Sequence, residues 1–265
     1  MLYNPVAIFD SGVGSLSIVR ELRKIVPSEN ILYFADKAHF PYGNKSHNAL
    51  RNVITGTVNY LEQYKPKVII VASITPSVRV LQEISSVSGI PLIGIKPPLE
   101  EASRVTRKRH IGIMGTTGTI RSKEFDSEIK KTIPQNIFIS KFDASEVIEL
   151  IEDGIHISDE RRTYDAIMRM LGESLNAKLD VMVLASTHLP FVRNYLATLM
   201  PAVKLLDSSR NVAKLVKRTL ASRRMLKKTG SGRLEILVSD KRREFERTLH
   251  NMALAQPVKE VFLTF

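Results

Sequence analysis

The sequence predicts an α/β protein made of two similar lobes, each with a mainly parallel sheet flanked by helices, and a cleft between them. Three observations predict this fold. Short apolar runs alternate with amphipathic helical stretches, which is the pattern of parallel strands joined by helical crossovers. The pattern begins again after about residue 110, and loops of small residues follow the corresponding strands in both halves. The chain therefore contains a weak internal repeat.

The first half contains three predicted strands and two predicted helices before residue 73. A loop of small residues, Asp10–Gly14, follows the first strand, and Pro66 ends the second helix. The predicted strands are Val6–Phe9, Ile31–Phe34 and Val68–Ala72, and the predicted helices are Leu16–Val26 and Leu50–Tyr64. A turn-rich stretch, residues 36–46, separates the second strand from the second helix.

The second half repeats this arrangement. Strand Ile111–Met114 leads into the loop Gly115–Thr119, and strand Val181–Ala185 leads into Ser186–His188. The first loop of each half precedes an Ala-Ser strand end, by 63 residues from Asp10 and by 71 from Gly115. Because ligands of open α/β sheets bind at the carboxyl ends of strands, we expect these four segments to surround one cleft.

The predicted lobes are discontinuous in sequence. The first consists of residues 1–96 and 207–265, and the second of residues 97–206. We expect the chain to cross between them near Ile95–Pro98 and Leu206–Ser208. The C-terminal strand Leu234–Ser239 and helix Arg242–Asn251 are then predicted to return to the first lobe.

The composition is that of an ordinary globular protein, with 43% hydrophobic and 25% charged residues among 265. The absence of Cys excludes disulfides, zinc–thiolate sites and a cysteine nucleophile. No His, Asp or Glu cluster has the spacing of a metal site, so we expect no metal. The opening residues Met1–Val6 do not resemble a signal peptide, and the longest apolar run, Val68–Ala72, is too short to cross a bilayer. We expect a cytoplasmic protein without membrane contact.

The net charge of +12 is concentrated toward the C-terminus, where Lys214–Lys228 holds seven Lys or Arg and no acid. This stretch fits an anionic or nucleic-acid partner, or a solvated helix face followed by a basic turn. The second interpretation is favoured, because no aromatic residue is present for stacking on bases. We expect the stretch to face solvent and to recognise no specific nucleic-acid sequence.

Four polar segments are candidates for chemistry, and each has a purely structural alternative. Asp10 either presents a carboxylate to a ligand at a strand end or caps the next helix. The loop Asp10–Gly14 lacks the glycine spacing of nucleotide-binding loops, which disfavours phosphate binding there. Gly115–Thr119 offers hydroxyl and N–H donors for a carboxylate, or a threonine N-cap. Tyr42, in the turn Pro41–Gly43, packs or reaches a ligand. Ser186–His188 places a hydroxyl near an imidazole, which is either structural or catalytic.

Together these segments resemble one family. The matching segments are Val6–Gly14, Tyr33–Asp36, Pro41–Ser46, Ile111–Thr116, Leu184–His188, Leu206–Ser208 and Val238–Asp240 with Phe245. The chain is similar in these segments to the glutamate racemases, which belong to the cofactor-independent aspartate/glutamate racemases. The resemblance implies two lobes related by a pseudo-twofold axis. It also implies racemization of an acidic amino acid by two thiols on opposite faces of the α-carbon, without a cofactor.

The resemblance also implies the site residues. Those expected to contact the amino acid are Asp10, Ser11, Tyr42, Gly43, Thr75, Thr119 and Thr187. Asp10, Glu152 and His188 would assist the two proton-transfer positions, which are occupied here by Ser73 and Ser186. Glu152 is assigned from the partial match Glu149–Gly154.

The chain departs from the family at both thiols. It has Ala72-Ser-Ile-Thr-Pro-Ser77 where the family has Ala-Cys-Asn-Thr-Ala-Ser, and Ala185-Ser-Thr-His188 where the family has Gly-Cys-Thr-His. Ile74 thus replaces a polar amide. A serine hydroxyl needs an adjacent base to react at neutral pH.

Three hypotheses therefore stay open. The first is an amino-acid racemase or a related isomerase with altered proton transfer. The second is a catalytically silent relative that binds a small acid or an anionic partner. The third is lyase or hydrolase chemistry that uses Ser186 with His188. The sequence leaves a homodimer open as well.

Overall fold

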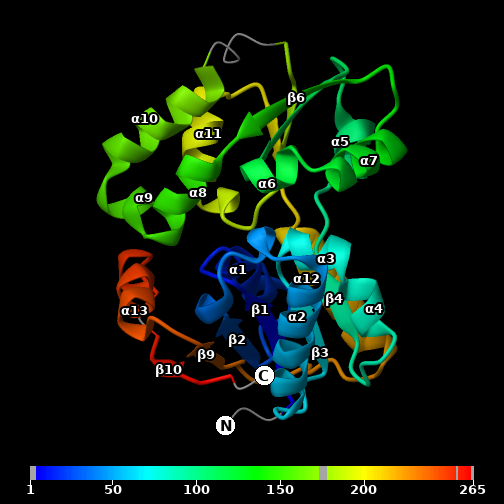
Figure 1. Ribbon diagram of the computed structural model, residues 1–265, viewed down its shortest axis with the longest axis vertical. Helices are drawn as coiled ribbons and strands as arrows, with labels where there is room; N and C mark the ends of the chain where they lie inside the picture. The colour runs from blue at the N-terminus through cyan, green and yellow to red at the C-terminus, as the bar shows by residue number, and fades with distance from the viewer. Residues whose placement is uncertain (1–3, 173–177, 255, 264–265) are drawn as a thin grey trace. The chain divides into compact units, whose positions relative to one another are not determined.

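The computed structural model describes residues 4–172, 178–254 and 256–263. The chain divides into two compact units (Figure 1): unit 1 comprises Met1–Lys96 and Ser209–Phe265, and unit 2 comprises Pro97–Ser208. Residues 1–3, on which the signal-peptide expectation depends, lie outside the described residues. No helix in the described ranges combines the length and the apolar character needed to cross a membrane.

Unit 1 contains a six-stranded sheet in which every neighbouring pair of strands is parallel. The order across the sheet is β10 (Val258–Glu260), β9 (Leu234–Val238), β2 (Ile31–Ala35), β1 (Val6–Asp10), β3 (Val68–Val71) and β4 (Leu92–Gly94). Val6 pairs with Ile31 on one side and with Val68 on the other. Because all strands run the same way, their carboxyl ends lie at one edge of the sheet.

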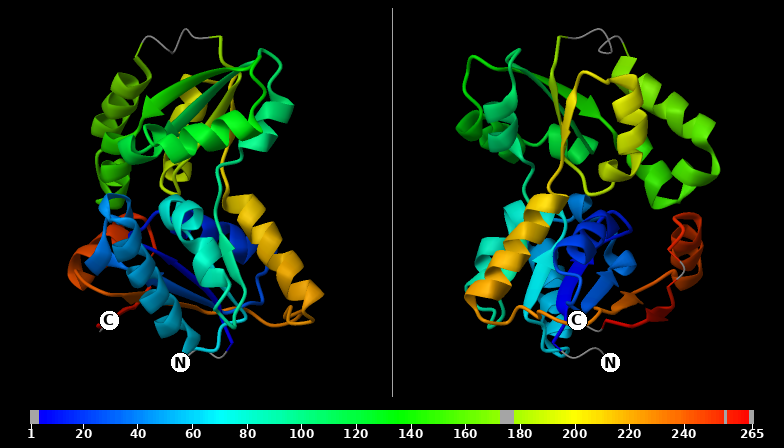
Figure 2. Two further views of the ribbon diagram at one scale, coloured as in Figure 1. Left: turned by 45° about the vertical axis from the view of Figure 1, so that its right-hand side comes forward. Right: turned by 180° about the vertical axis from the view of Figure 1, so that it is seen from behind.

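Helices cover both faces of the unit 1 sheet, which explains why its central strands are continuously apolar. Helix α2 (His47–Glu62) packs on the face that carries Ala7, Phe9 and Leu32. Helices α1 (Leu16–Ile25) and α12 (Ser209–Ser222) pack against each other on the opposite face (Figures 1 and 2). The remaining helices of this unit are α3 (Ile74–Arg79), α4 (Leu81–Ser85), α13 (Arg242–Asn251), and the short 3-10 helices η1 (Lys37–His39) and η2 (Tyr42–Asn44).

Unit 2 has a smaller parallel sheet of four strands. Their order is β6 (Phe138–Asp143), β5 (His110–Gly115), β7 (Val181–Leu184) and β8 (Lys204–Leu206). Its helices are α5 (Leu99–Val105), α6 (Thr117–Ile120), α7 (Lys123–Thr132), α8 (Ser145–Glu152), α9 (Ile155–Ser158), α10 (Glu160–Leu171), α11 (Arg193–Leu199) and the 3-10 helix η4 (Leu189–Val192).

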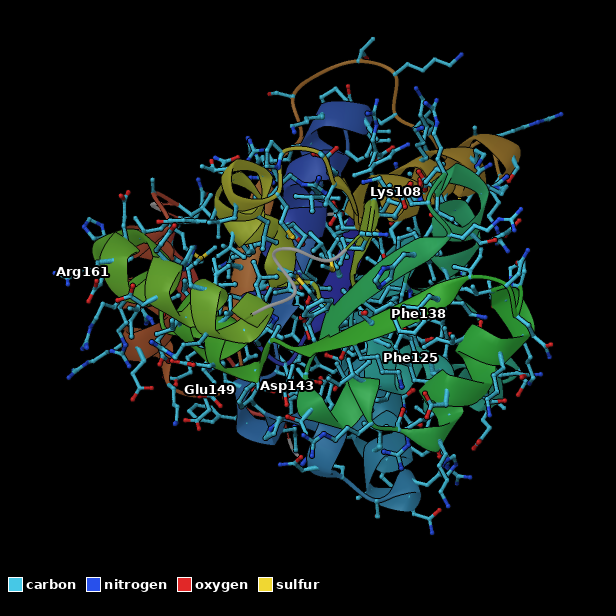
Figure 3. All side chains as sticks on the ribbon, turned by 90° about the horizontal axis from the view of Figure 1, so that it is seen from above. Lys108, Phe125, Phe138, Asp143, Glu149 and Arg161 are labelled. Carbon is cyan, nitrogen blue, oxygen red and sulfur yellow. The ribbon has the colours of Figure 1, made fainter. Side chains whose placement is uncertain are left out.

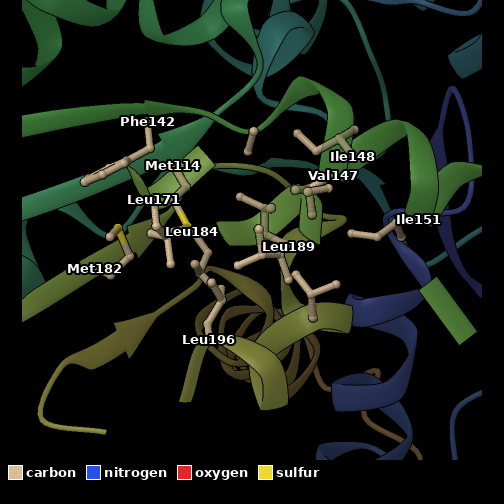
Figure 4. Packing of buried hydrophobic residues seen from close by; sticks show 14 of the residues in the cluster. Met114, Phe142, Val147, Ile148, Ile151, Leu171, Met182, Leu184, Leu189 and Leu196 are labelled. Atoms are coloured by element: carbon tan, nitrogen blue, oxygen red, sulfur yellow. The ribbon is translucent and has the colours of Figure 1, made fainter. Parts of the chain in front are cut away.

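The core of unit 2 forms where the strands meet helices α8, α10 and α11. Met114, Met182 and Leu184 from the strands belong to one buried cluster with Val147 and Ile151 of α8 (Figure 4). At the outer strand β6 the sheet is less covered: Phe138 is exposed (Figure 3), and its ring meets the edge of the His110 ring with centroids 4.7 Å apart. The central strands β5 and β7 are buried on both faces, since Ile111, Ile113 and Val183 are as inaccessible as Met114 and Met182.

The two units share one strand order, which confirms the internal repeat. In each unit the first strand lies between the second and the third, and the fourth lies beyond the third. Strand β9 pairs with β2, so the C-terminal segment returns to the first unit as predicted. The three-residue strands β4, β8 and β10 and the six-residue strand β6 were not among the predicted elements. Helix α2 begins three residues earlier than predicted, because the Ser46 hydroxyl caps it by accepting a hydrogen bond from Ala49 N–H at 3.3 Å.

Candidate functional site

The candidate residues form two sets, one in each unit, and each set lies at the carboxyl edge of a parallel sheet. Asp10 ends β1, and Ser73 follows β3 by two residues. In unit 2, Gly115 ends β5, and Ser186 follows β7 by two residues. Strand polarity therefore places the side chains that follow β1 and β3 at one edge, and those that follow β5 and β7 at the matching edge.

Asp10 is almost fully buried and does not cap helix α1. Its carboxylate accepts a hydrogen bond from the backbone N–H of Ser11 at 2.7 Å, whereas the N-cap position of α1 is Ser15. The loop between Asp10 and Ser15 is held in place by Tyr33, whose hydroxyl donates a hydrogen bond to the carbonyl oxygen of Gly12. The capping alternative for Asp10 is therefore wrong, because helix α1 begins only at Leu16.

A second buried carboxylate at this edge is Asp36, which was not among the predicted site residues. Asp36 is fully buried, and its oxygens contact the hydroxyl groups of Tyr42 (2.9 Å) and Ser239 (3.0 Å) and the Nδ1 of His39 (2.8 Å). The sequence signal was present, since Asp36 lies two residues after the predicted strand Ile31–Phe34 and Ser239 is the last residue of the predicted strand Leu234–Ser239. Asp36 thus ties the ends of β2 and β9 to the Tyr42 turn.

Tyr42 is a buried partner of Asp36, and Gly43 beside it is exposed. Burial, followed by the negative charge of Asp36 and its hydrogen bond, raises the pKa of Tyr42 well above its usual value. The phenol therefore stays protonated and donates to Asp36. Tyr42 is only 2% exposed, whereas Pro41 and Gly43 on either side of it are open to solvent.

Ser73 occupies the N-cap position of helix α3, but its hydroxyl makes no capping hydrogen bond. Ser73, Ile74 and Thr75 are all half-buried. Ser77 holds this helix start in place, because its hydroxyl donates to the carbonyl of Ser73 at 2.7 Å and accepts from Ile95 N–H at 3.0 Å. The backbone at Ser73 is thus fixed by hydrogen bonds, while its hydroxyl does not cap the helix.

In unit 2, Ser186, His188 and Glu152 form a connected set. The Nε2 of His188 lies 2.8 Å from the Oε2 of Glu152, and its Nδ1 lies 3.4 Å from the Oγ of Ser186. The backbone N–H of His188 also donates to the Ser186 Oγ at 3.4 Å. An ionised Glu152 only accepts hydrogen bonds, so Nε2 carries a proton. In the neutral ring, the lone pair of Nδ1 then faces the serine.

Glu152 reaches His188 because it lies on the buried face of helix α8. Val147, Ile148 and Ile151 bury this face in the unit 2 core, and Glu152 follows Ile148 by four residues. Glu152 and His188 are both buried, at 7% exposure each, so the carboxylate accepts a hydrogen bond from the imidazole in place of one from bulk water. Gly154, with φ of 73°, then allows the chain to turn into α9.

A second imidazole, His156, lies near this set and was not found from the sequence. It is 4% exposed, its ring lies 5.9 Å from that of Phe191, and its Nδ1 has no hydrogen-bond partner among the described residues. Burial, opposed by a backbone hydrogen bond at Leu150 and supported by the nearby His188, lowers the pKa of His156. His156 is therefore a neutral neighbour of His188.

The threonine loop of unit 2 begins helix α6 with a threonine cap. Thr116 caps helix α6, since its hydroxyl accepts from the N–H of Thr119, and the two hydroxyls lie 3.0 Å apart. Thr119 and Thr187 are half-buried at the edge of the sheet. The N-cap interpretation of this loop is confirmed, and the hydroxyl of Thr119 stays partly accessible. No three His, Asp or Glu side chains of the described ranges gather in an arrangement that could hold a metal ion.

The fold and these two edges define a class of protein: a two-unit α/β protein with matching four-strand parallel cores and polar residues at their carboxyl ends. The Asp/Glu/Hydantoin racemase family matches residues 15–216, and the chain belongs to this family. The resemblance predicted from the motifs is thereby confirmed, and the chain is glutamate-racemase-like.

Three known proteins illustrate the similarity. The glutamate racemase of Pseudomonas paraeruginosa is 33% identical over 225 residues, which cover 84% of this chain and 83% of that protein. The crystal structure of glutamate racemase from Thermus thermophilus in complex with β-chloro-D-alanine has a TM-score of 0.82 at 27% identity, covering 98% and 97% of the two chains. The Escherichia coli glutamate racemase, in complex with L-glutamate and the activator UDP-MurNAc-ala, has the same fold, with a TM-score of 0.85 at 24% identity over 99% and 100%.

Proposed function

We propose that this protein binds an acidic amino acid such as glutamate and transfers its α-proton without a cofactor, from the side of unit 2 only. The observation that carries the proposal is the connected set Ser186–His188–Glu152, with its contacts of 3.4 and 2.8 Å. Membership of the racemase family and the naming of its relatives as glutamate racemases support the choice of substrate.

The proton transfer proceeds through the serine hydroxyl. The Ser186 O–H bond breaks and its proton moves to the Nδ1 of His188, while the serine oxygen takes the α-proton of the amino acid. The electron pair of the broken C–H bond passes to the α-carbon and its carboxylate. Glu152 holds the resulting imidazolium through Nε2, and the backbone N–H of His188 stabilises negative charge on the serine oxygen. Reversal of these steps with a proton from solvent returns the same enantiomer.

The corresponding serine of unit 1 lacks such support. Among the described residues, no imidazole or carboxylate hydrogen bonds to the hydroxyl of Ser73. Without an adjacent base, a hydroxyl is a poor proton acceptor near neutral pH. We therefore expect exchange of the α-proton with solvent to be much faster than inversion.

The binding groups are the polar residues that the family resemblance implies. The groups proposed to contact the amino acid are Asp10, Ser11, Tyr42, Gly43, Thr75, Thr119 and Thr187. Ile74 replaces an amide in this set, so one contact to the zwitterion is apolar. We expect weaker recognition of glutamate than an amide at this position would give.

The test is incubation with L- and D-glutamate and aspartate in D2O, followed by NMR of the α-proton. We expect exchange of one enantiomer with little inversion. Ser186→Ala, His188→Gln and Glu152→Gln should each slow exchange by about 10²–10⁴-fold, the usual contribution of a proton-transfer group. Ser73→Ala is the matched control in unit 1 and should leave the exchange rate within about twofold.

A failed exchange experiment identifies the alternatives. Binding of the amino acid without exchange, measured by calorimetry, would support the silent relative. Exchange slowed equally by Ser73→Ala and Ser186→Ala would contradict the one-sided proposal and indicate two-sided transfer by hydroxyl groups.

The second candidate function is nucleophilic chemistry at Ser186. Its hydroxyl contacts the imidazole of His188, and the carboxylate of Glu152 orients that imidazole. A serine nucleophile and its general base are arranged in the same way. Covalent labelling of the protein by a fluorophosphonate probe, abolished by Ser186→Ala and retained by Ser73→Ala, would favour this candidate. Exchange of the α-proton without labelling favours the first.

A further inference from the structure

The net positive charge of the protein is located in unit 1. Unit 1 contains 24 Lys and Arg against 11 Asp and Glu, whereas unit 2 contains 15 against 16. The net charge of +12 is therefore carried by unit 1, and the surface that carries it is far more basic than the average of the chain.

Much of this charge lies on one surface, which we call the α1/α12 basic face. It consists of exposed side chains from two helices and from the segment that follows α12: Arg20, Arg23, Arg210, Lys214, Lys217, Arg218, Arg223, Arg224, Lys227 and Lys228. None of these ten side chains forms an ion pair within the described part of the chain. The expectation that Lys214–Lys228 faces solvent is confirmed.

The two helices lie side by side with the same polarity. The hydroxyls of Ser17 and Ser209 lie 3.3 Å apart, which brings the first turns of α1 and α12 together, and the helices stay in contact along their length (Figure 2). Their outward faces therefore form one surface. Along α12, Arg210, Lys214 and Lys217 follow the helical spacing of one stripe.

The segment after α12 is held against the end of α1. The buried carboxylate of Glu29 accepts hydrogen bonds from the backbone N–H of Lys227 and from the Nζ of Lys67, each at 2.6 Å. The same Lys67 donates to the carbonyl of Met225 at 2.8 Å. The backbone that carries Arg223 to Lys228 is thus anchored beside the helices, with its basic side chains free to point outward.

From this surface we propose that the α1/α12 basic face binds the phosphate backbone of double-stranded nucleic acid without regard to sequence. Charge complementarity identifies the occupant, because a duplex carries one negative charge per about 1.7 Å. Helix α12, with 14 residues, is about 21 Å long, and a duplex of that length carries about twelve phosphates on its two strands, of which only those on the near side can meet the face.

The composition of the face distinguishes a duplex from other anionic partners. Six of the ten side chains are Arg, whose planar fork binds phosphate oxygens in pairs. The face has no aromatic side chain on which unpaired bases could stack, which disfavours single strands. Only Leu215 and Met225 are exposed apolar residues on it, 40% and 38% exposed, and two isolated apolar side chains do not form a membrane-inserting surface.

The test uses the full-length protein and two unrelated 20-base-pair DNA duplexes labelled with a fluorophore. We expect anisotropy titrations at low salt to show binding of both duplexes with affinities within about threefold. The logarithm of the affinity should fall linearly with the logarithm of salt concentration, by about 0.9 for each phosphate neutralised.

The variant that tests the location is Lys214→Glu with Lys217→Glu and Arg218→Glu. Its matched control is Lys130→Glu with Lys131→Glu and Arg161→Glu, exposed residues of unit 2 that give the same change in net charge. We expect the first triple variant to lose at least tenfold in affinity and the control to stay within about threefold. A triple change of the same three α12 residues to Gln, with circular dichroism of each variant, separates loss of binding from loss of folding and should lower the salt slope by about 2.7.

Three outcomes would overturn the proposal. Equal losses in the two Glu variants would show an effect of net charge alone. Absence of binding at low salt would show that the face is only solvated. Tighter association with phosphatidylserine vesicles than with either duplex would identify a membrane surface as the partner. None of these residues belongs to the amino-acid site, so the result is independent of the proton-exchange experiment.

Discussion

The buried polar side chains at the carboxyl edges of the two sheets depend on one another for their hydrogen bonds, so replacing a single residue affects stability. Asp36 and Glu152 are both carboxylates in apolar surroundings, and each is matched by donors from other segments. A buried polar group is tolerated only when its hydrogen bonds are made, because its water shell is lost on folding. Removing one member of such a set therefore penalises those that remain.

This predicts that Asp36→Ala destabilises the protein. The substitution leaves the hydroxyls of Tyr42 and Ser239 without their acceptor, which should lower the free energy of unfolding by about 1–3 kcal/mol for each buried donor left unpaired. Urea denaturation measures the effect. Asp240→Ala, at an exposed position one residue after Ser239, is the control and should change stability by less than about 0.5 kcal/mol.

His156 should make stability depend on pH below neutrality. Its pKa is lowered in the folded protein, so between the folded pKa and the ordinary value of 6.5 the unfolded chain binds more protons. Its contribution is intact above pH 6.5 and is lost as pH falls through the folded pKa, at up to about 1.4 kcal/mol per pH unit. We expect His156→Phe to weaken the fall in stability between pH 7.5 and 5.5.

Urea melts at several pH values test this expectation. His250→Gln, at an exposed position, should retain the pH dependence of the unaltered protein. His110, whose pKa is also lowered by burial, is present in both variants and leaves part of the dependence in place. An unchanged profile for His156→Phe would contradict the assignment.

Ser73 and Ser186 occupy the two positions at which the family has cysteine thiols. We expect Ser73→Cys, Ile74→Asn and Ser186→Cys together to confer glutamate racemization, because a thiol has an ordinary pKa near 8.5 and the amide restores polar recognition. The rate should exceed that of the unaltered chain by about 10²–10⁴-fold, measured by chiral chromatography. Ser186→Cys alone should accelerate exchange without inversion, and racemization by this single variant would contradict two-sided transfer.

At the scale of elements, the sheet of unit 1 depends on one close approach of backbone to backbone. Gly232, just before β9, donates its N–H to the carbonyl of Pro27 at 2.8 Å, and a Cβ at this position would lie 1.9 Å from the carbonyl oxygen of Glu29. The atoms that such a Cβ would meet belong to the backbone of Glu29, which cannot move aside as a flexible side chain can. The entry of β9 beside β2 therefore requires glycine at this position.

We accordingly expect Gly232→Ala to lower the free energy of unfolding by about 1–3 kcal/mol, the usual cost of overpacking. Gly89→Ala is the matched control, because a Cβ there meets nothing within 4 Å, and it should be neutral or slightly stabilising. Thermal melts of the two variants compare them directly. Similar melting temperatures would show that the β9 entry can shift without cost.

At the scale of the whole molecule, the two units differ in how the chain builds them. Unit 2 is one continuous segment, Pro97–Ser208, with its own four-stranded sheet and core. Unit 1 needs both ends of the chain, because β9 from the C-terminal segment pairs with β2. We propose that these limits, within two residues of the predicted domains, are those of two folding units.

A fragment of residues 97–208 should therefore fold alone and unfold cooperatively in urea. A fragment of residues 1–96 should not, because it leaves the edge of β2 unpaired and lacks the helix that covers α1. Circular dichroism and size-exclusion chromatography of the two fragments test this. A cooperative transition for residues 1–96 would contradict the dependence of unit 1 on the C-terminal segment.

Part of the secondary structure could be predicted from the sequence, whereas the three-residue strands, the six-residue strand β6 and helices α7, α8 and α10 of unit 2 were not predicted. Helix Arg242–Asn251 and strands β1, β2, β3 and β9 agree with their predicted limits to within one residue. Strands β4, β8 and β10 have only three residues each, too few for a period to show. Short strands are specified by the neighbours they pair with rather than by their own pattern.

The α/β class, the repeat, the family and the basic stretch around α12 could all be inferred from the amino-acid sequence alone. These depend on local patterns and on motifs that are continuous in the chain. Only the tertiary structure decided that Glu152 bonds to His188 across 36 residues, that Asp36 gathers three donors, and that α1 joins α12 in one basic surface. These facts depend on which strands and helices become neighbours, and a hydrogen bond between distant residues leaves no periodic trace in the sequence.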